Sequence, residues 1–235
     1  MKHSSRATFF MTMIAGVLGL LLRFWLLSAE DSRNLLPSWH ISTVLLILLS
    51  AGYLVFLFFQ TRKMRTLTYP DLFPASPVSG ALTVLAALAL ALYTVSAATA
   101  LHNRLLIPML LLGAAAVVCM LAAAWYRFQG KALNLTFLII ITLYLMSHMA
   151  VQSQTWEHIP QSVRFLPPML ASVFLLIGSY HQAAFSVQEK SADTYVFSTQ
   201  AALYFCLLSL TDAASLFYLA MALWTASGSL SSREG

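Results

Sequence analysis

Long apolar runs dominate the pattern of hydrophobic and polar positions along the chain. They do not alternate with the period of a strand, and each approaches the roughly 20 residues that a helix needs to cross the hydrocarbon core of a bilayer. The runs cover 7–28, 40–60, 78–99, 105–127, 132–152, 165–187 and 196–226. The pattern therefore predicts an all-α, polytopic membrane bundle of seven transmembrane helices, formed by residues 1–235 as a single domain.

The last predicted helix is the longest of the seven. The segment from Tyr195 to Ala226 supplies too few residues for two full crossings, so we interpret it as one tilted or bent helix. Small residues indicate where other helices approach each other. Gly16 and Gly19 mark such a place in the first predicted helix, and the alanine-rich third and fourth are expected to pack as antiparallel neighbours.

Composition supports a membrane protein: 60% of the 235 residues are hydrophobic and 9% are charged. Soluble domains carry about 25% charged residues. The formal net charge of +5 does not indicate a nucleic-acid partner, because the basic residues lie beside apolar runs without interleaved aromatic residues. The expected partner is the lipid bilayer. Cys119 and Cys206 lie in apolar runs without metal-ligand or redox spacing, so we expect no metal and no cofactor.

Lysine and arginine residues near the predicted helix ends indicate the orientation. Eight belong to the segments on the side of the amino terminus and four to the alternating segments. The positive-inside rule then places the amino terminus in the cytoplasm and, after seven crossings, the carboxyl terminus outside. We expect a multi-pass protein of the plasma membrane or bacterial inner membrane. The loop 61–77 holds the densest basic cluster and is the expected contact for a partner membrane or cytoplasmic protein.

Five tryptophans provide a second guide to the ends of the predicted helices, since tryptophan is enriched at membrane–water interfaces. The layout assigns four to outer boundaries and one to an inner boundary: Trp25, Trp39, Trp156 and Trp224 outside, and Trp125 inside.

Asp212 is the most unusual polar residue of the predicted helices. It lies near the middle of the last one, where a charged side chain costs roughly 2.5–3.5 kcal/mol on insertion scales. Ser209 and Ser215 lie three residues to either side, which puts all three on one stripe of a continuous helix. Asp212 is either a proton, cation or ligand site, or a structural aspartate that is protonated or hydrogen-bonded. Arg23 is its natural counter-charge if the first and last helices are neighbours; otherwise Arg23 extends to the outer headgroups.

A second polar stripe lies on the fifth predicted helix. Tyr144, His148 and Gln152 follow one another at intervals of four residues and therefore share a face in its outer half. A histidine in this position titrates, binds an anion or hydrogen-bonds another helix. Together with polar residues of the third helix, this stripe predicts a cavity open to the outside with Asp212 at its floor.

No nucleophile–base pair, metal motif or phosphate-binding motif occurs, so the sequence does not favour an enzyme. It favours a small-molecule or ion-coupled receptor or transporter whose ligand-binding residues are drawn from the two polar stripes and Arg23. The alternative is a non-catalytic membrane subunit that stabilises or positions a partner membrane protein.

Overall fold

The computed structural model describes residues 4–29, 40–62, 76–99, 106–131, 133–156, 162–186 and 192–230. Over these residues the chain forms eight α-helices and no strand. Their bounds are α1 (Ser4–Ser28), α2 (Ile41–Thr61), α4 (Pro77–Thr99), α5 (Leu106–Gln129), α6 (Leu135–Trp156), α7 (Ser162–Ser186), α8 (Ala192–Leu208) and α9 (Ser215–Leu230). The first six predicted helices are confirmed as helices.

The prediction of one continuous helix over 196–226 is wrong. After α8 the chain forms a 3₁₀ turn over Ser209–Thr211, and Asp212 has extended backbone angles, φ −86° and ψ 165°. α9 then runs back along α8, since the Gln200 Nε2 donates to the Ser229 Oγ at 2.8 Å. The physical reason lies in contacts that one continuous helix would not make. The break brings Asp212 to Arg23 of α1, with 2.7 Å between the Arg23 Nη2 and the Asp212 Oδ1, and lets α9 pack along α8.

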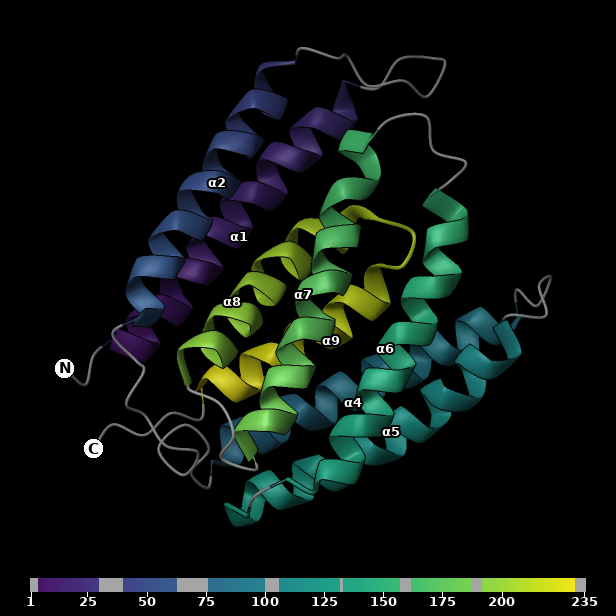
Figure 1. Ribbon diagram of the computed structural model, residues 1–235. Coiled ribbons are helices and arrows are strands. Elements are labelled where there is room, and N and C mark those ends of the chain that lie inside the picture. Colours follow the sequence, from purple (N-terminus) through teal and green to yellow (C-terminus); the bar gives the residue numbers. More distant parts are fainter. Residues whose placement is uncertain are drawn as a thin grey trace.

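α8 is the central helix of the bundle. It packs against α1, α2, α7 and α9 (Figure 1), and 13 of its 17 residues are buried. Ser198, Thr199 and Gln200 are buried along with the apolar residues of α8, so this short helix lies inside the bundle and has no lipid-facing stripe. α4 and α5 pack closely against each other, as expected, and α9 lies against α4.

The amino-terminal end of α1 and the carboxyl-terminal end of α9 lie at the same end of the bundle (Figure 1). α1 runs parallel to α8, because Gly16 lies against Leu207 while Gly19 lies against Leu208. α9 is antiparallel to both. We call this the terminal end, which also holds Arg62, and we call the opposite end, which holds Arg23 and the α8–α9 turn, the turn end. Over the described residues, α1 therefore begins and α9 ends at the same end of the bundle, whereas one long helix over 196–226 would have put these two points at opposite ends.

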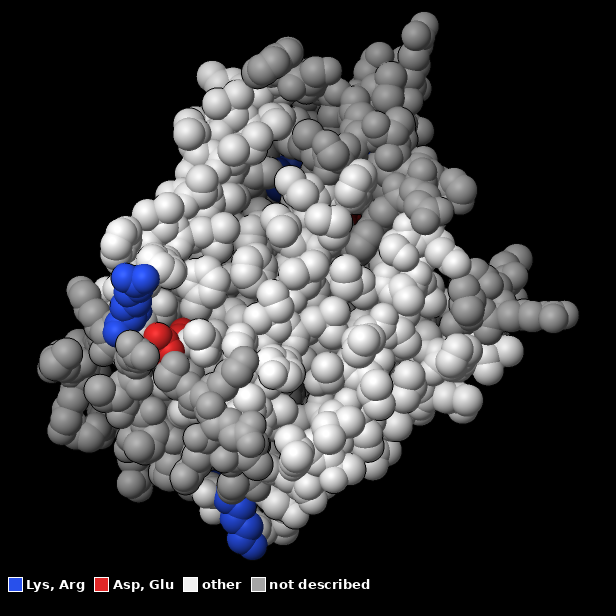
Figure 2. Space-filling view, in the orientation of Figure 1, with Lys and Arg blue, Asp and Glu red and all other residues white. Residues whose placement is uncertain are grey.

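Five of the described helices are long and apolar enough to cross a membrane: α1, α2, α4, α5 and α6. They place large apolar side chains on the surface, such as Phe24, Leu111 and Val118, each more than 60% exposed. Over the face seen in Figure 2, the described surface between the two ends is nearly free of charged side chains. This is the surface expected of helices that contact lipid.

Three of the five tryptophan side chains are described. Trp25 and Trp125 are exposed near the ends of their helices, while the inner and outer boundaries assigned to them stay predictions. Trp224 does not lie at the same end as Trp25, as the layout predicted; it is 6% exposed and packs at the terminal end under Arg127, because α9 returns to that end. Trp39 and the side chain of Trp156 lie outside the described residues.

Candidate functional site

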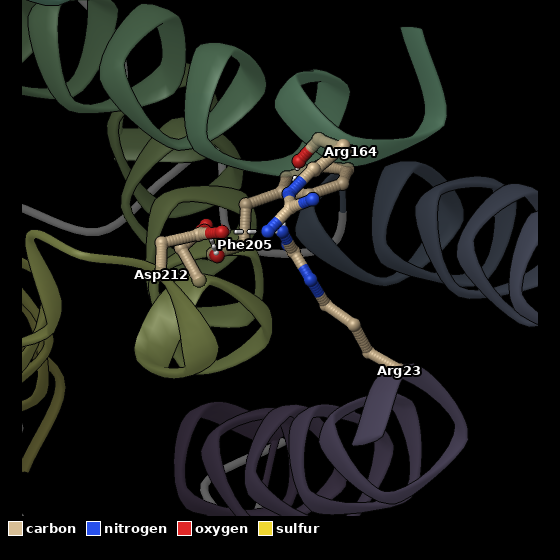
Figure 3. Close-up of polar contacts among 5 residues, drawn as sticks. Arg23, Arg164, Phe205 and Asp212 are labelled. Atoms are coloured by element: carbon tan, nitrogen blue, oxygen red, sulfur yellow. Dashed lines mark hydrogen bonds and ion pairs between the residues drawn. The ribbon is translucent and has the colours of Figure 1, made fainter. Parts of the chain in front are cut away.

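An ion pair at the turn end joins α1 to the α8–α9 turn. The Arg23 Nη2 donates to the Asp212 Oδ1 at 2.7 Å (Figure 3). The Arg23 side chain is 2% exposed and that of Asp212 is 21% exposed, so Asp212 is the member of the pair that reaches the surface. Of the two alternatives for Arg23, the structure has the one in which it points inward to Asp212.

Pairing requires α1 and α8 to be close, and their glycine contact provides this. A Cβ atom on Gly16 would lie 2.4 Å from the Leu207 Cδ1. Such a distance is shorter than van der Waals contact, so the two helices approach this closely only without a side chain at this position. The small residues of the first helix thus mark a close helix contact, as predicted, and this contact carries Arg23 to the turn end of α8.

A second acceptor for Arg23 comes from α7. The same Nη2 atom donates to the backbone carbonyl of Arg164 at 2.9 Å. In a regular helix this carbonyl would accept from the N–H of residue 168, but Pro168 has no N–H. The proline therefore leaves the Arg164 carbonyl available, and the guanidinium of Arg23 uses it.

Both members of the pair also carry a buried polar atom without a hydrogen-bond partner among the described residues. These atoms are the Arg23 Nη1 and the Asp212 Oδ2. Buried polar groups are nearly always hydrogen-bonded, so an unpartnered donor on one member of the pair and an unpartnered acceptor on the other call for an explanation. Tyr218 of α9 lies close enough to interact electrostatically with both charged groups.

The structure separates the two serines from the stripe predicted for them. Ser209 is fully buried and bonds the Phe205 carbonyl. Ser215 is the first residue of α9, and its backbone N–H donates to the Asp212 carbonyl at 3.0 Å. A shared stripe needs one continuous helix, and the helix is broken at this point. Nor does Asp212 lie mid-helix: it lies level with Arg23, which is five residues before the end of α1.

Tyr144 and His148 lie together inside the bundle, as their spacing predicted, and each is 1% exposed. The His148 ring stacks on Phe217 of α9 with centroids 3.6 Å apart, and its Nε2 lies 3.2 Å from the Tyr93 hydroxyl. Gln152 of the same stripe is half-buried. Both rings pack against Phe217. The cavity open to the outside that was predicted around them stays a prediction.

Sequence reasoning missed a second buried arginine, Arg127, at the terminal end. It is 5% exposed, donates to the Thr83 hydroxyl at 3.0 Å and to the Ser227 hydroxyl, and stands 4.5 Å over the Trp224 ring. Its position in the last turn of α5 is typical of an interfacial residue. The return of α9 to this end buries it, and no signal in the α5 sequence indicates that return.

Metal binding finds no support in the described part of the chain, where no three His, Cys, Asp or Glu side chains are grouped to hold an ion. Loop 61–77, the predicted partner contact, lies outside the described residues from 63 to 75. Comparison with known proteins gave no match: no protein family fits the sequence, and neither a curated protein nor a solved structure is detectably similar.

Proposed function

We propose that the chain is a multi-pass membrane protein, a transporter or receptor, that binds a small polar solute or ion at Arg23 and Asp212. The observation that carries this proposal is the pair of unpartnered buried atoms, the Arg23 Nη1 and the Asp212 Oδ2. A solute that offers an acceptor to the first and a donor or cation to the second satisfies both. Such a solute is a zwitterion, or a cation bound together with water.

The broken helix supports a binding role over a purely structural one. Within a membrane, irregular backbone is tolerated where it is buried in protein or lines an aqueous cavity. Many transporters bind their substrates where a helix is interrupted, because the interruption frees backbone groups and helix ends for the ligand. In this chain the interruption carries the acidic residue itself, and the Asp212 side chain is the partly exposed member of the pair.

Orientation follows from the basic residues of the corrected topology. Because α9 returns to the terminal end, Arg233 joins the residues on the side of the amino terminus, which makes nine against three. We infer a cytoplasmic terminal end, and Asp212 then lies toward the outside. In this arrangement the site receives solutes from outside the cell.

Thermal unfolding of the purified full-length chain tests the proposal. The protein is screened against small zwitterions and inorganic cations over a range of pH, as wild type, Asp212→Asn and Arg127→Gln. A ligand at 100 times its Kd stabilises the folded state by about 2.7 kcal/mol. We expect a solute that raises the Tm of the wild type and of Arg127→Gln, but not of Asp212→Asn.

The Arg127→Gln variant is the matched control, because it also removes a buried arginine contact, but at the opposite end. The readout is the shift between ligand-free and ligand-bound protein, so a lower starting Tm does not affect it. A shift that persists in Asp212→Asn, or no shift with any solute, contradicts the proposal. Copurification of a specific membrane protein in that case favours the alternative role of a non-catalytic subunit.

A further inference from the structure

A groove of about 320 Å³ lies at the terminal end, far from the Arg23–Asp212 pair. α2 and α7 form its sides and α8 packs between them. Its volume falls within the range of sites that hold small molecules. None of the residues singled out for the turn-end site lines it.

The groove has one polar end and one apolar wall. Arg62, His181 and Asp193 lie near the ends of their helices, where the bundle meets its terminal end. About one turn further into the bundle, the wall consists of Phe58 and Phe197, and Phe174 and Ile177 continue it along α7. A ligand that fits this division has a charged head and an apolar tail aligned with the helices.

Three phenylalanine rings make the apolar wall continuous from α2 to α7. Phe197 packs edge to face against Phe58 on one side, with ring centroids 6.5 Å apart, and against Phe174 on the other, at 6.2 Å. Phe58 is 44% exposed and Ile177 is 40% exposed, so the wall opens to the side of the bundle. An acyl chain reaches such a wall directly from the bilayer.

Charge determines which head group fits. The Arg62 guanidinium stands 4.3 Å over the Phe58 ring, which holds the cation at the junction of the polar end and the apolar wall. The Asp193 carboxylate accepts from the Thr194 N–H at 2.9 Å within its own helix.

The geometry points to a binding site for an anionic phospholipid, with the phosphate on Arg62 and one acyl chain along Phe58, Phe197 and Ile177. Arginine binds phosphate through two parallel hydrogen bonds, and anionic lipids are enriched in the cytoplasmic leaflet, where the proposed orientation puts this end. The site is independent of the proposed solute site, because the two lie at opposite ends of the bundle.

Native mass spectrometry of the full-length chain, delipidated in detergent and titrated with phosphatidylglycerol or with phosphatidylcholine of the same acyl chains, tests the site. We expect phosphatidylglycerol to bind about tenfold more tightly than phosphatidylcholine. Arg62→Gln abolishes this preference, and Ile177→Trp, which fills the groove, lowers the affinity for both lipids about tenfold. Lys131→Gln and Val118→Trp are the controls, because both residues are exposed and lie outside the groove. We expect both control variants to bind the two lipids as the wild type does.

A second measurement locates the lipid without relying on a variant. Phosphatidylglycerol with a photoreactive acyl chain is crosslinked to the wild-type protein, and the modified peptides are mapped. Crosslinks to residues 174–197 support the proposal, and crosslinks distributed evenly over the lipid-facing helices overturn it. Equal binding of the two lipids, or unchanged binding in both Arg62→Gln and Ile177→Trp, also overturns it, as does a groove occupied by a second copy of the chain.

Discussion

Arg23 is held in place by one group from α7 and one from the α8–α9 turn. Its acceptors are a carboxylate in the α8–α9 turn and a carbonyl that Pro168 leaves without its usual helical donor. A buried ion pair by itself contributes little net stability, because desolvation of both charges offsets their attraction. Loss of one member is costly, since the other is then left buried without its partner.

We therefore expect the two residues to be strongly coupled. Asp212→Asn should lower the free energy of unfolding by about 2–4 kcal/mol, because Arg23 keeps its charge and loses its counter-charge. The double variant Arg23→Met/Asp212→Asn should lose less than the sum of the two single changes, by about 1–3 kcal/mol. Denaturant unfolding in detergent measures all four proteins of the cycle. Additive losses would mean that the pair is not formed in the folded protein.

Among the elements, the α8–α9 hairpin gives the bundle its core. α8 lies among four other helices, and its contact with α1 depends on a helix surface without side chains at Gly16 and Gly19. In lipid the hydrophobic effect does not drive helices together, so close packing of this kind contributes much of the attraction between them.

Gly16→Val should lower the free energy of unfolding by about 1–3 kcal/mol, because the new side chain overlaps Leu207 and forces α1 away from α8. The matched control is Gly52→Val in α2, since nothing lies within 4 Å of a Cβ atom placed on Gly52. The control should change stability by no more than about 0.5 kcal/mol. Unfolding of both variants in detergent compares them, and equal losses would contradict the close contact of α1 with α8.

For the whole molecule, the break at Asp212 determines at which end of the bundle α9 ends. Eight helices return the end of α9 to the end of the bundle where α1 begins. One helix in place of the hairpin would put the carboxyl terminus on the opposite side.

Fusion of green fluorescent protein to either terminus distinguishes the two topologies. Green fluorescent protein becomes fluorescent when it folds in the cytoplasm, but not when the bacterial secretion pathway exports it unfolded. Both fusions should be fluorescent, in line with nine basic residues against three on the side of the termini. Fluorescence of the amino-terminal fusion alone would contradict the hairpin and indicate an odd number of crossings.

Local patterns in the sequence are enough to predict six of the helices and to identify the charged residues that need a counter-charge or a hydrogen-bond partner. Bilayer-length apolar runs identify six helices because lipid leaves no other way to satisfy so many backbone groups. Asp212 and Arg23 stand out because a charge in an apolar segment is costly wherever the segment packs. The spacing of Tyr144 and His148 also places them correctly on one face.

The hairpin formed by the last run could not be predicted from local patterns, because it depends on tertiary contacts. The same holds for the burial of Arg127 and for its packing over Trp224. The run 196–226, which is mostly apolar and has no proline or glycine, satisfies the pattern of one long helix equally well. The hairpin prevails because it places α8 among four neighbours and brings Asp212 to Arg23. The contact between Arg23 and Asp212 joins residues 189 positions apart, and local patterns carry no information about such distant pairs.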